Sequence, residues 1–156
     1  MGYPMAKNLI NKKLNLKVFS RTLEKAKPLE KIGAIIANSL GEAVKEADIV
    51  ITMLTDDEAV EKVLSDQEFL NNLKNSSTVI DMSSIKPKIA IQYGNFLKDK
   101  NIHFLDAPVS GGTIGAEEGS LAIMVGGDQN VFNGAFDILK IMGNPTLVGP
   151  IGSGQV

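Results

Sequence analysis

One segment limits the fold of this chain more than any other. Residues 48–54 (Asp48-Ile49-Val50-Ile51-Thr52-Met53-Leu54) form a nearly continuous apolar run, without the alternation of a strand that has one face in water. Such strands are typical of parallel sheets covered by helices on both faces. Further short runs with strand character alternate with stretches of helical period: Leu16–Ser20, Ala34–Ala37, Thr78–Met82, His103–Ala107, Leu121–Val125 and Thr146–Val148. Residues 1–156 are therefore predicted to form one α/β domain, a Rossmann-like, doubly wound and mainly parallel sheet.

Helix starts are indicated by side chains that can satisfy the first free N–H groups. Ser39 followed by Glu42, and Thr55 followed by Glu58, have the form of a capping box. Pro87 suits the first turn of a helix because its φ angle is fixed. Apolar residues at helical spacing near the C-terminus predict a helix with one buried face: Val131, Phe132, Ala135, Phe136, Leu139 and Met142.

The beginning of the chain departs from the usual order of a parallel α/β fold. Residues 1–9 have helical character, and no strand-like run precedes them. In this fold the first strand normally lies at the centre of the sheet and leads into the first phosphate-binding turn. We therefore expect a sheet that lacks its first strand, with a gap whose backbone donors and acceptors are unpaired.

Composition narrows the classes of partner. The net charge of −2 provides no broad basic field for nucleic acid or an anionic membrane surface. With no cysteine and one histidine, the chain has little from which to build a metal site. It has neither a signal sequence nor an apolar run near the roughly 20 residues that a membrane span needs. These features predict a cytoplasmic domain without metal, nucleic-acid or membrane binding.

A glycine-rich turn follows the predicted strand that ends at Ala107. Its adjacent glycines leave backbone amides unshielded, and the preceding serine adds a hydroxyl, so Ser110, Gly111 and Gly112 have the groups to hold a carboxylate. Taken alone, the same residues also fit an ordinary turn between a strand and a helix.

The wider sequence resembles the 3-hydroxyisobutyrate dehydrogenase, or β-hydroxyacid dehydrogenase, family. Residues 106–127 are similar to its pattern DxPVSGGxxGAxxGTLxIMVGG, and residues 79–87 to its IDMSTxxP segment. Residues 1–9 resemble the second half of its phosphate loop, of which Gly2 is the one glycine present. The resemblance covers essentially the whole chain and implies an incomplete NAD(P)-binding domain, without the all-helical C-terminal domain of that family.

The resemblance also implies roles for particular residues. Gly2 would belong to the cofactor's phosphate site, Met53 and Leu54 would lie beside its adenosine, and Ser84 would lie near the nicotinamide ribose. Ser110, Gly111 and Gly112 would bind the substrate carboxylate. As an alternative, Ser83 and Ser84 would only cap the helix that Pro87 begins. The family's proton-transferring lysine would come two positions after Val156, so no catalytic residue is assigned within the chain and the chain alone is expected to be inactive.

The residues after the strand 16–20 bear on the choice of cofactor. An acidic residue there would bind the adenosine ribose hydroxyls and repel a 2′-phosphate, but the chain has Ser20, Arg21 and Thr22. A guanidinium can grip a phosphate through two parallel hydrogen bonds. NADP is therefore the predicted cofactor, with NAD as the alternative. An arginine that is merely solvated at a helix start is the competing interpretation.

The predicted activity of the intact protein is hydride transfer between a nicotinamide cofactor and a small 3-hydroxy acid or its semialdehyde. By the same resemblance, the intact protein is expected to be a homo-oligomer. 6-Phosphogluconate is a less favoured substrate, because its dehydrogenase typically has Gly-Gly-Asn where this chain has Met82-Ser83-Ser84. A non-catalytic, dehydrogenase-like module for cofactor binding or assembly is the alternative function. His103 is assigned no role, because it stands at the start of a predicted strand and ligand sites of such sheets lie beyond strand ends.

Overall fold

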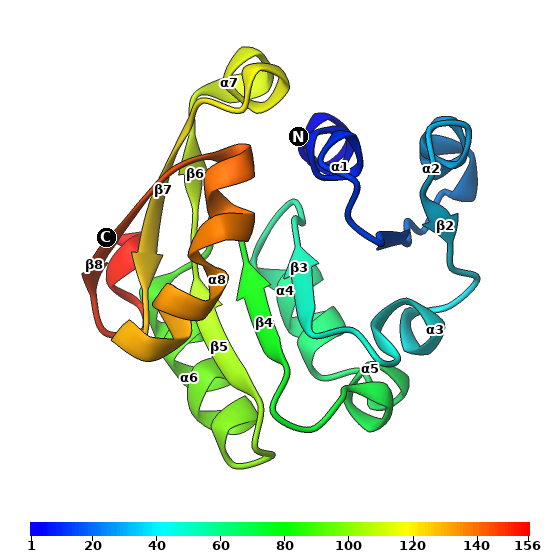
Figure 1. Cartoon of the computed structure of the whole chain (residues 1–156). Helices are drawn as coiled ribbons and strands as arrows, with labels where there is room; N and C mark the ends of the chain where they lie inside the picture. Colours follow the sequence, from blue (N-terminus) through cyan, green and yellow to red (C-terminus); the bar gives the residue numbers. More distant parts are fainter.

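The computed structural model describes residues 1–156, in which strands and helices alternate along the chain (Figure 1). The strands are β1 Lys17–Val18, β2 Ile35–Ile36, β3 Ile49–Thr52, β4 Thr78–Asp81, β5 His103–Asp106, β6 Val109–Ser110, β7 Leu121–Gly126 and β8 Gly143–Gly149. The helices are α1 Gly2–Asn11, α2 Leu23–Glu30, α3 Leu40–Val44, α4 Asp57–Leu64, α5 Gln67–Asn72, α6 Pro87–Lys98, α7 Gly112–Glu118, α8 Gln129–Met142 and the short 3-10 helix η1 Ser153–Gln155.

The larger sheet is mainly parallel, as predicted. Strands β3, β4 and β5 pair in parallel, and Thr52, Asp81 and Asp106 lie side by side at their last positions. β7 runs antiparallel to β5 and β6 and parallel to β8. The short β6 was not predicted, and β8 begins earlier than the predicted run Thr146–Val148.

The expected gap is present between two separate sheets. β1 and β2 pair only with each other, whereas β3 is an edge strand of the larger sheet. Figure 1 shows β2 and α2 standing apart from β3. Lys17 bridges the two parts by donating from Nζ to the carbonyls of Glu42 and Lys45. Ile49–Ile51 of β3 are only half-buried, because no strand covers their open edge.

Helices cover both faces of the larger sheet. One cluster of buried side chains joins β4, β5 and β7 to α1, α7 and α8, and includes Met5, Leu105 and Leu139. A second cluster on the other face joins the sheet to α4, α5 and α6, and includes Val60 and Leu97. This arrangement confirms the doubly wound α/β fold. None of the helices combines the length and the apolar character that crossing a membrane requires.

Two of the predicted helix starts are confirmed. Ser39 precedes α3, and its side chain accepts the N–H of Glu42 at 3.1 Å. Pro87 occupies the start of α6.

Two predictions for helices are wrong in detail. The residue that caps α4 is Asp56 rather than Thr55, because its carboxylate accepts the N–H of Ala59 at 2.8 Å. In α8, Phe136 does not belong to the buried face but is 38% exposed. Its ring packs edge-on against Phe132 at the surface, with 5.8 Å between the ring centroids.

The core at β5 provides a test of the fold. Leu105 is 0% exposed, so the variant Leu105→Ala should lower the free energy of unfolding by about 2–5 kcal/mol. Ile114 is 70% exposed, and Ile114→Ala is the matched control, with an expected change below about 0.5 kcal/mol. Urea unfolding of both variants measures the difference. Equal changes in the two variants would contradict the described packing.

Candidate functional site

The predicted site residues follow the carboxyl ends of strands, where open α/β sheets bind ligands. Met53 and Leu54 follow β3, and Ser83 and Ser84 follow β4. Ser110 ends β6, which continues the direction of β5 before the chain turns into α7. The larger sheet therefore presents these residues along one edge.

The N-terminus of α1 lies against the end of β3. A Cβ placed on Gly2 would be 3.9 Å from Cβ of Met53, an ordinary van der Waals contact. No side chain caps α1, and its first turn has no acidic residue. The first N–H groups of a helix have no partner within the helix and carry its positive partial charge. Such helix ends are suited to anions, and the phosphate-binding role of Gly2 stays a prediction.

Hydrogen bonds tie the end of β3 to the end of β4. The hydroxyl of Thr52 donates to Oδ1 of Asp81 at 2.8 Å, and the N–H of Ser83 donates to the same oxygen at 3.2 Å. Oγ of Ser83 in turn accepts the N–H of Leu54 at 2.8 Å. Thr52, Asp81 and Ser83 are all buried, whereas Ser84 is exposed.

The alternative role for the two serines is not what the structure shows. Lys86 is the N-cap of α6, and no side-chain hydrogen bond caps that helix. Ser83 instead links the two strand ends, which leaves only Ser84 to face outward.

Two carboxyl groups are buried side by side beneath this edge. Asp81 and Asp106 are both 0% exposed, and Oδ2 of Asp81 has no hydrogen-bond partner. Burial raises the pKa of the Asp81 carboxyl, hydrogen bonds from Ser83 and Thr52 oppose that shift, and the nearby Asp106 adds to it. Burial also raises the pKa of Asp106, against the opposing hydrogen bonds from the N–H groups of Gly152 and Gly154.

The predicted carboxylate-binding turn is open at the surface. Ser110, Gly111 and Gly112 are exposed, and Gly112 begins α7 without a side-chain cap. Gly111 has φ +138° and Gly112 has φ +61°, backbone angles that residues other than glycine rarely adopt. α7 is also joined to α1, because Nδ2 of Asn8 donates to the carbonyl of Ala116 at 2.8 Å.

The residues predicted to select the cofactor follow the first strand of the separate β1–β2 sheet. Ser20, Arg21 and Thr22 follow β1, and Oγ of Ser20 accepts the N–H of Thr22 at 3.3 Å. Arg21 is exposed and forms no ion pair. No hydrogen bond joins these three residues to the predicted site residues on the larger sheet.

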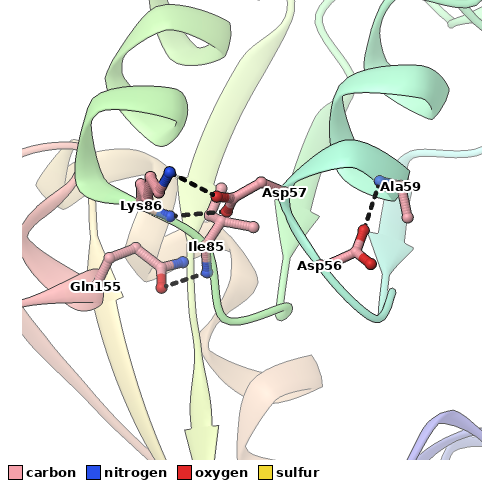
Figure 2. A network of polar contacts seen from close by, with 6 residues as sticks. All are labelled: Asp56, Asp57, Ala59, Ile85, Lys86 and Gln155. Atoms are coloured by element: carbon pink, nitrogen blue, oxygen red, sulfur yellow. Dashed lines mark hydrogen bonds and ion pairs between the residues drawn. The ribbon is translucent and has the colours of Figure 1, made fainter.

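Several functional side chains were missed by the sequence reasoning. Asp57 and Gln155 both bind the backbone of the turn between β4 and α6 (Figure 2). Asp106 was recognised only as part of a pattern, although its carboxylate accepts the N–H groups of Gly152 and Gly154 at 2.7 Å and 3.0 Å. The repeated glycines after Pro150 were the available signal, because paired unshielded amides can surround a carboxylate.

A hollow of about 520 Å³ lies at the opposite edge of the sheet. Its lining includes His103 at the start of β5, together with Ile49, Val131 and Gly134. None of the predicted site residues lines it. No group of three or more His, Asp or Glu side chains is arranged so that it could hold a metal ion.

Comparisons with known proteins show the family to which this chain is similar. The family model for the NAD-binding domain of 6-phosphogluconate dehydrogenase matches residues 1–152. A probable mitochondrial 3-hydroxyisobutyrate dehydrogenase of Dictyostelium discoideum is 40% identical over an alignment of 158 positions, which covers 100% of this chain and 49% of that protein. The chain spans about half the length of the curated relatives that it matches.

Solved structures show the same likeness. The 3-hydroxyisobutyrate dehydrogenase of Mycobacterium tuberculosis with L-serine has a TM-score of 0.95 and 34% identity, covering 99% of this chain and 53% of that one. A protein described as Psf3, in complex with NADP+ and 2-OPP, has a TM-score of 0.94 and 25% identity, covering 99% of this chain and 56% of that one.

The buried carboxyls predict a pH dependence of stability. A carboxyl whose pKa is raised in the folded state binds its proton more tightly there than in the unfolded chain. Stability should therefore fall as the pH rises through the raised pKa of Asp81, by at most about 1.4 kcal/mol per pH unit for one proton.

The variant Asp81→Asn should flatten this dependence, because it removes the titrating group. Urea unfolding between pH 4 and pH 8 measures the slope, and Asp137→Asn on the exposed side of α8 is the control for losing one carboxylate. An unchanged slope in Asp81→Asn would contradict the assignment.

Proposed function

The chain belongs to the family of NAD-binding domains represented by that of 6-phosphogluconate dehydrogenase, and on this premise we propose the function of the protein that contains it. It forms the cofactor-binding part of an NADP-dependent dehydrogenase of the 3-hydroxyisobutyrate type. The observation that carries this proposal is the uncapped N-terminus of α1, which lies against the end of β3 at the same edge as the exposed Ser84.

Each part of the cofactor has a place along this edge in the proposal. The N–H groups at the start of α1 hold the pyrophosphate beside Gly2. Met53 and Leu54 lie beside the adenosine, and the hydroxyl of Ser84 binds the nicotinamide ribose. When bound, the nicotinamide supplies the acceptor or donor of a hydride.

The substrate is a small 3-hydroxy acid or its semialdehyde. The hydroxyl of Ser110 and the N–H groups of Gly111 and Gly112 bind its carboxylate, which sets the orientation of the carbon that exchanges the hydride. The L-serine found with the Mycobacterium tuberculosis protein is itself a 3-hydroxy acid, which supports this class. A cytoplasmic location and a homo-oligomeric intact protein are part of the same proposal.

Arg21 tests the choice of cofactor. In the proposal its guanidinium binds the 2′-phosphate of NADP, so Arg21→Gln should weaken NADPH binding by about tenfold and leave NADH binding unchanged. Titration of nicotinamide fluorescence measures both affinities. Lys31→Gln, which removes an exposed positive charge after the far end of α2, is the matched control. An unaltered chain that binds NADH at least as tightly as NADPH would contradict the NADP preference.

We assign no residue of this chain to proton transfer. A placed acid or base contributes about 10²- to 10⁴-fold to such reactions, and no residue of the chain matches the family's lysine. The purified chain should therefore bind NADPH and show no measurable turnover of 3-hydroxyisobutyrate. An assay of NADPH formation at 340 nm checks this, and robust turnover would contradict it.

A further inference from the structure

Gln155 binds the turn between β4 and α6 at two backbone positions. Its Oε1 accepts the N–H of Ile85 at 3.0 Å, and its Nε2 donates to the carbonyl of Ser83 at 3.0 Å. These two backbone groups flank Ser84 in the sequence. One side chain from the far end of the chain thus holds both sides of the residue that faces outward.

Asp57 holds the same turn at a different residue, Lys86. Oδ1 of Asp57 at the start of α4 accepts the N–H of Lys86 at 3.0 Å, and its Oδ2 lies 3.8 Å from Nζ of the same residue. Figure 2 shows Asp57 and Gln155 reaching the Ile85–Lys86 backbone from different sides. The N–H of Ser83 also donates to Asp81, and its hydroxyl oxygen accepts the N–H of Leu54, so these contacts together leave little freedom for the backbone at Ser84.

The segment that carries Gln155 is itself fixed. The carboxylate of Asp106 accepts the N–H groups of Gly152 and Gly154, so η1 is attached to the end of β5. A Cβ on Gly154 would lie only 2.4 Å from the carbonyl oxygen of Met124, which means that the close approach needs glycine. Gly152 has φ +96°. The segment of Gln155 therefore links the end of β5 to the turn after β4.

We propose that Gln155 is a positioning residue for the nicotinamide half of the cofactor. By holding Ser83 and Ile85, it fixes the direction in which the Ser84 hydroxyl faces the nicotinamide ribose. Its attachment to Asp106 sets that hydroxyl relative to the turn at Ser110, which follows β5. This inference rests on the proposed function and adds a residue to which no role in cofactor binding was assigned.

The test compares ligands that occupy different halves of the site. Gln155→Ala removes both bonds to the turn, so NADPH should bind about tenfold more weakly. Adenosine 2′,5′-bisphosphate, which lacks the nicotinamide half, should bind as it does to the unaltered chain. The matched control is Gln129→Ala, which removes a glutamine whose Nε2 bonds only to the exposed Asn133. That control should leave both affinities unchanged.

A second variant distinguishes a positioning role of Gln155 from a general loss of structure. Gln155→Glu keeps an acceptor for the Ile85 N–H but places a carboxylate oxygen against the Ser83 carbonyl, so NADPH binding should again weaken selectively. Amide hydrogen exchange of residues 82–86 should accelerate by about tenfold in both variants, while β7 keeps its protection.

The outcomes divide clearly. Selective weakening of NADPH binding, with faster amide exchange at residues 82–86, supports the role of Gln155. Equal weakening of both ligands indicates a structural role, and no weakening indicates no role; either overturns the inference while the proposed function stands. An unaltered chain that binds neither ligand overturns the proposed function and, with it, the cofactor role of Gln155.

Discussion

The common end of β3, β4 and β5 is the constraint on which the rest of the site depends. Thr52, Asp81 and Asp106 occupy the last positions of the three strands in one register. Their side chains are buried: Thr52 donates to Asp81, Asp81 accepts the N–H of Ser83 after β4, and Asp106 accepts the N–H groups of Gly152 and Gly154 after β8. Burying a carboxyl costs free energy unless hydrogen bonds or a proton compensate. In this fold the hydrogen bonds that offset the burial of Asp81 and Asp106 are the same bonds that order the turns of the candidate site.

This arrangement connects groups that are far apart in the sequence. Asp106 fixes η1, Gln155 of η1 holds the turn after β4, and Ser83 of that turn holds Leu54 after β3. The three strand ends are thus linked by side chains as well as by the backbone pairing of the sheet. In the proposed function a hydride is transferred only between closely positioned carbons, so this linkage would matter most in the nicotinamide half of the site.

Much of the fold was predictable from local pattern. The apolar run at 48–54 indicated a parallel strand, and Ser39 and Pro87 indicated helix starts, because each of these signals acts within a few residues. The Asp56 cap was missed because Thr55 beside it offers the same chemistry one position earlier. The gap between β3 and the pair β1–β2 was expected because no strand-like run precedes residues 1–9.

The site was predictable in part, since resemblance indicated Gly2, Ser84 and Ser110, whose individual roles stay predictions. Gln155 could not be found in this way, because its bonds span 70 and 72 positions of the chain and exist only once η1 is folded. The most direct test of the account is a crystal structure of the protein with NADP+. The account predicts the pyrophosphate at the start of α1 beside Gly2, and a hydroxyl of the nicotinamide ribose about 2.5–3.0 Å from Oγ of Ser84. A cofactor bound in the hollow beside His103, or one that leaves Ser84 without contact, would contradict it.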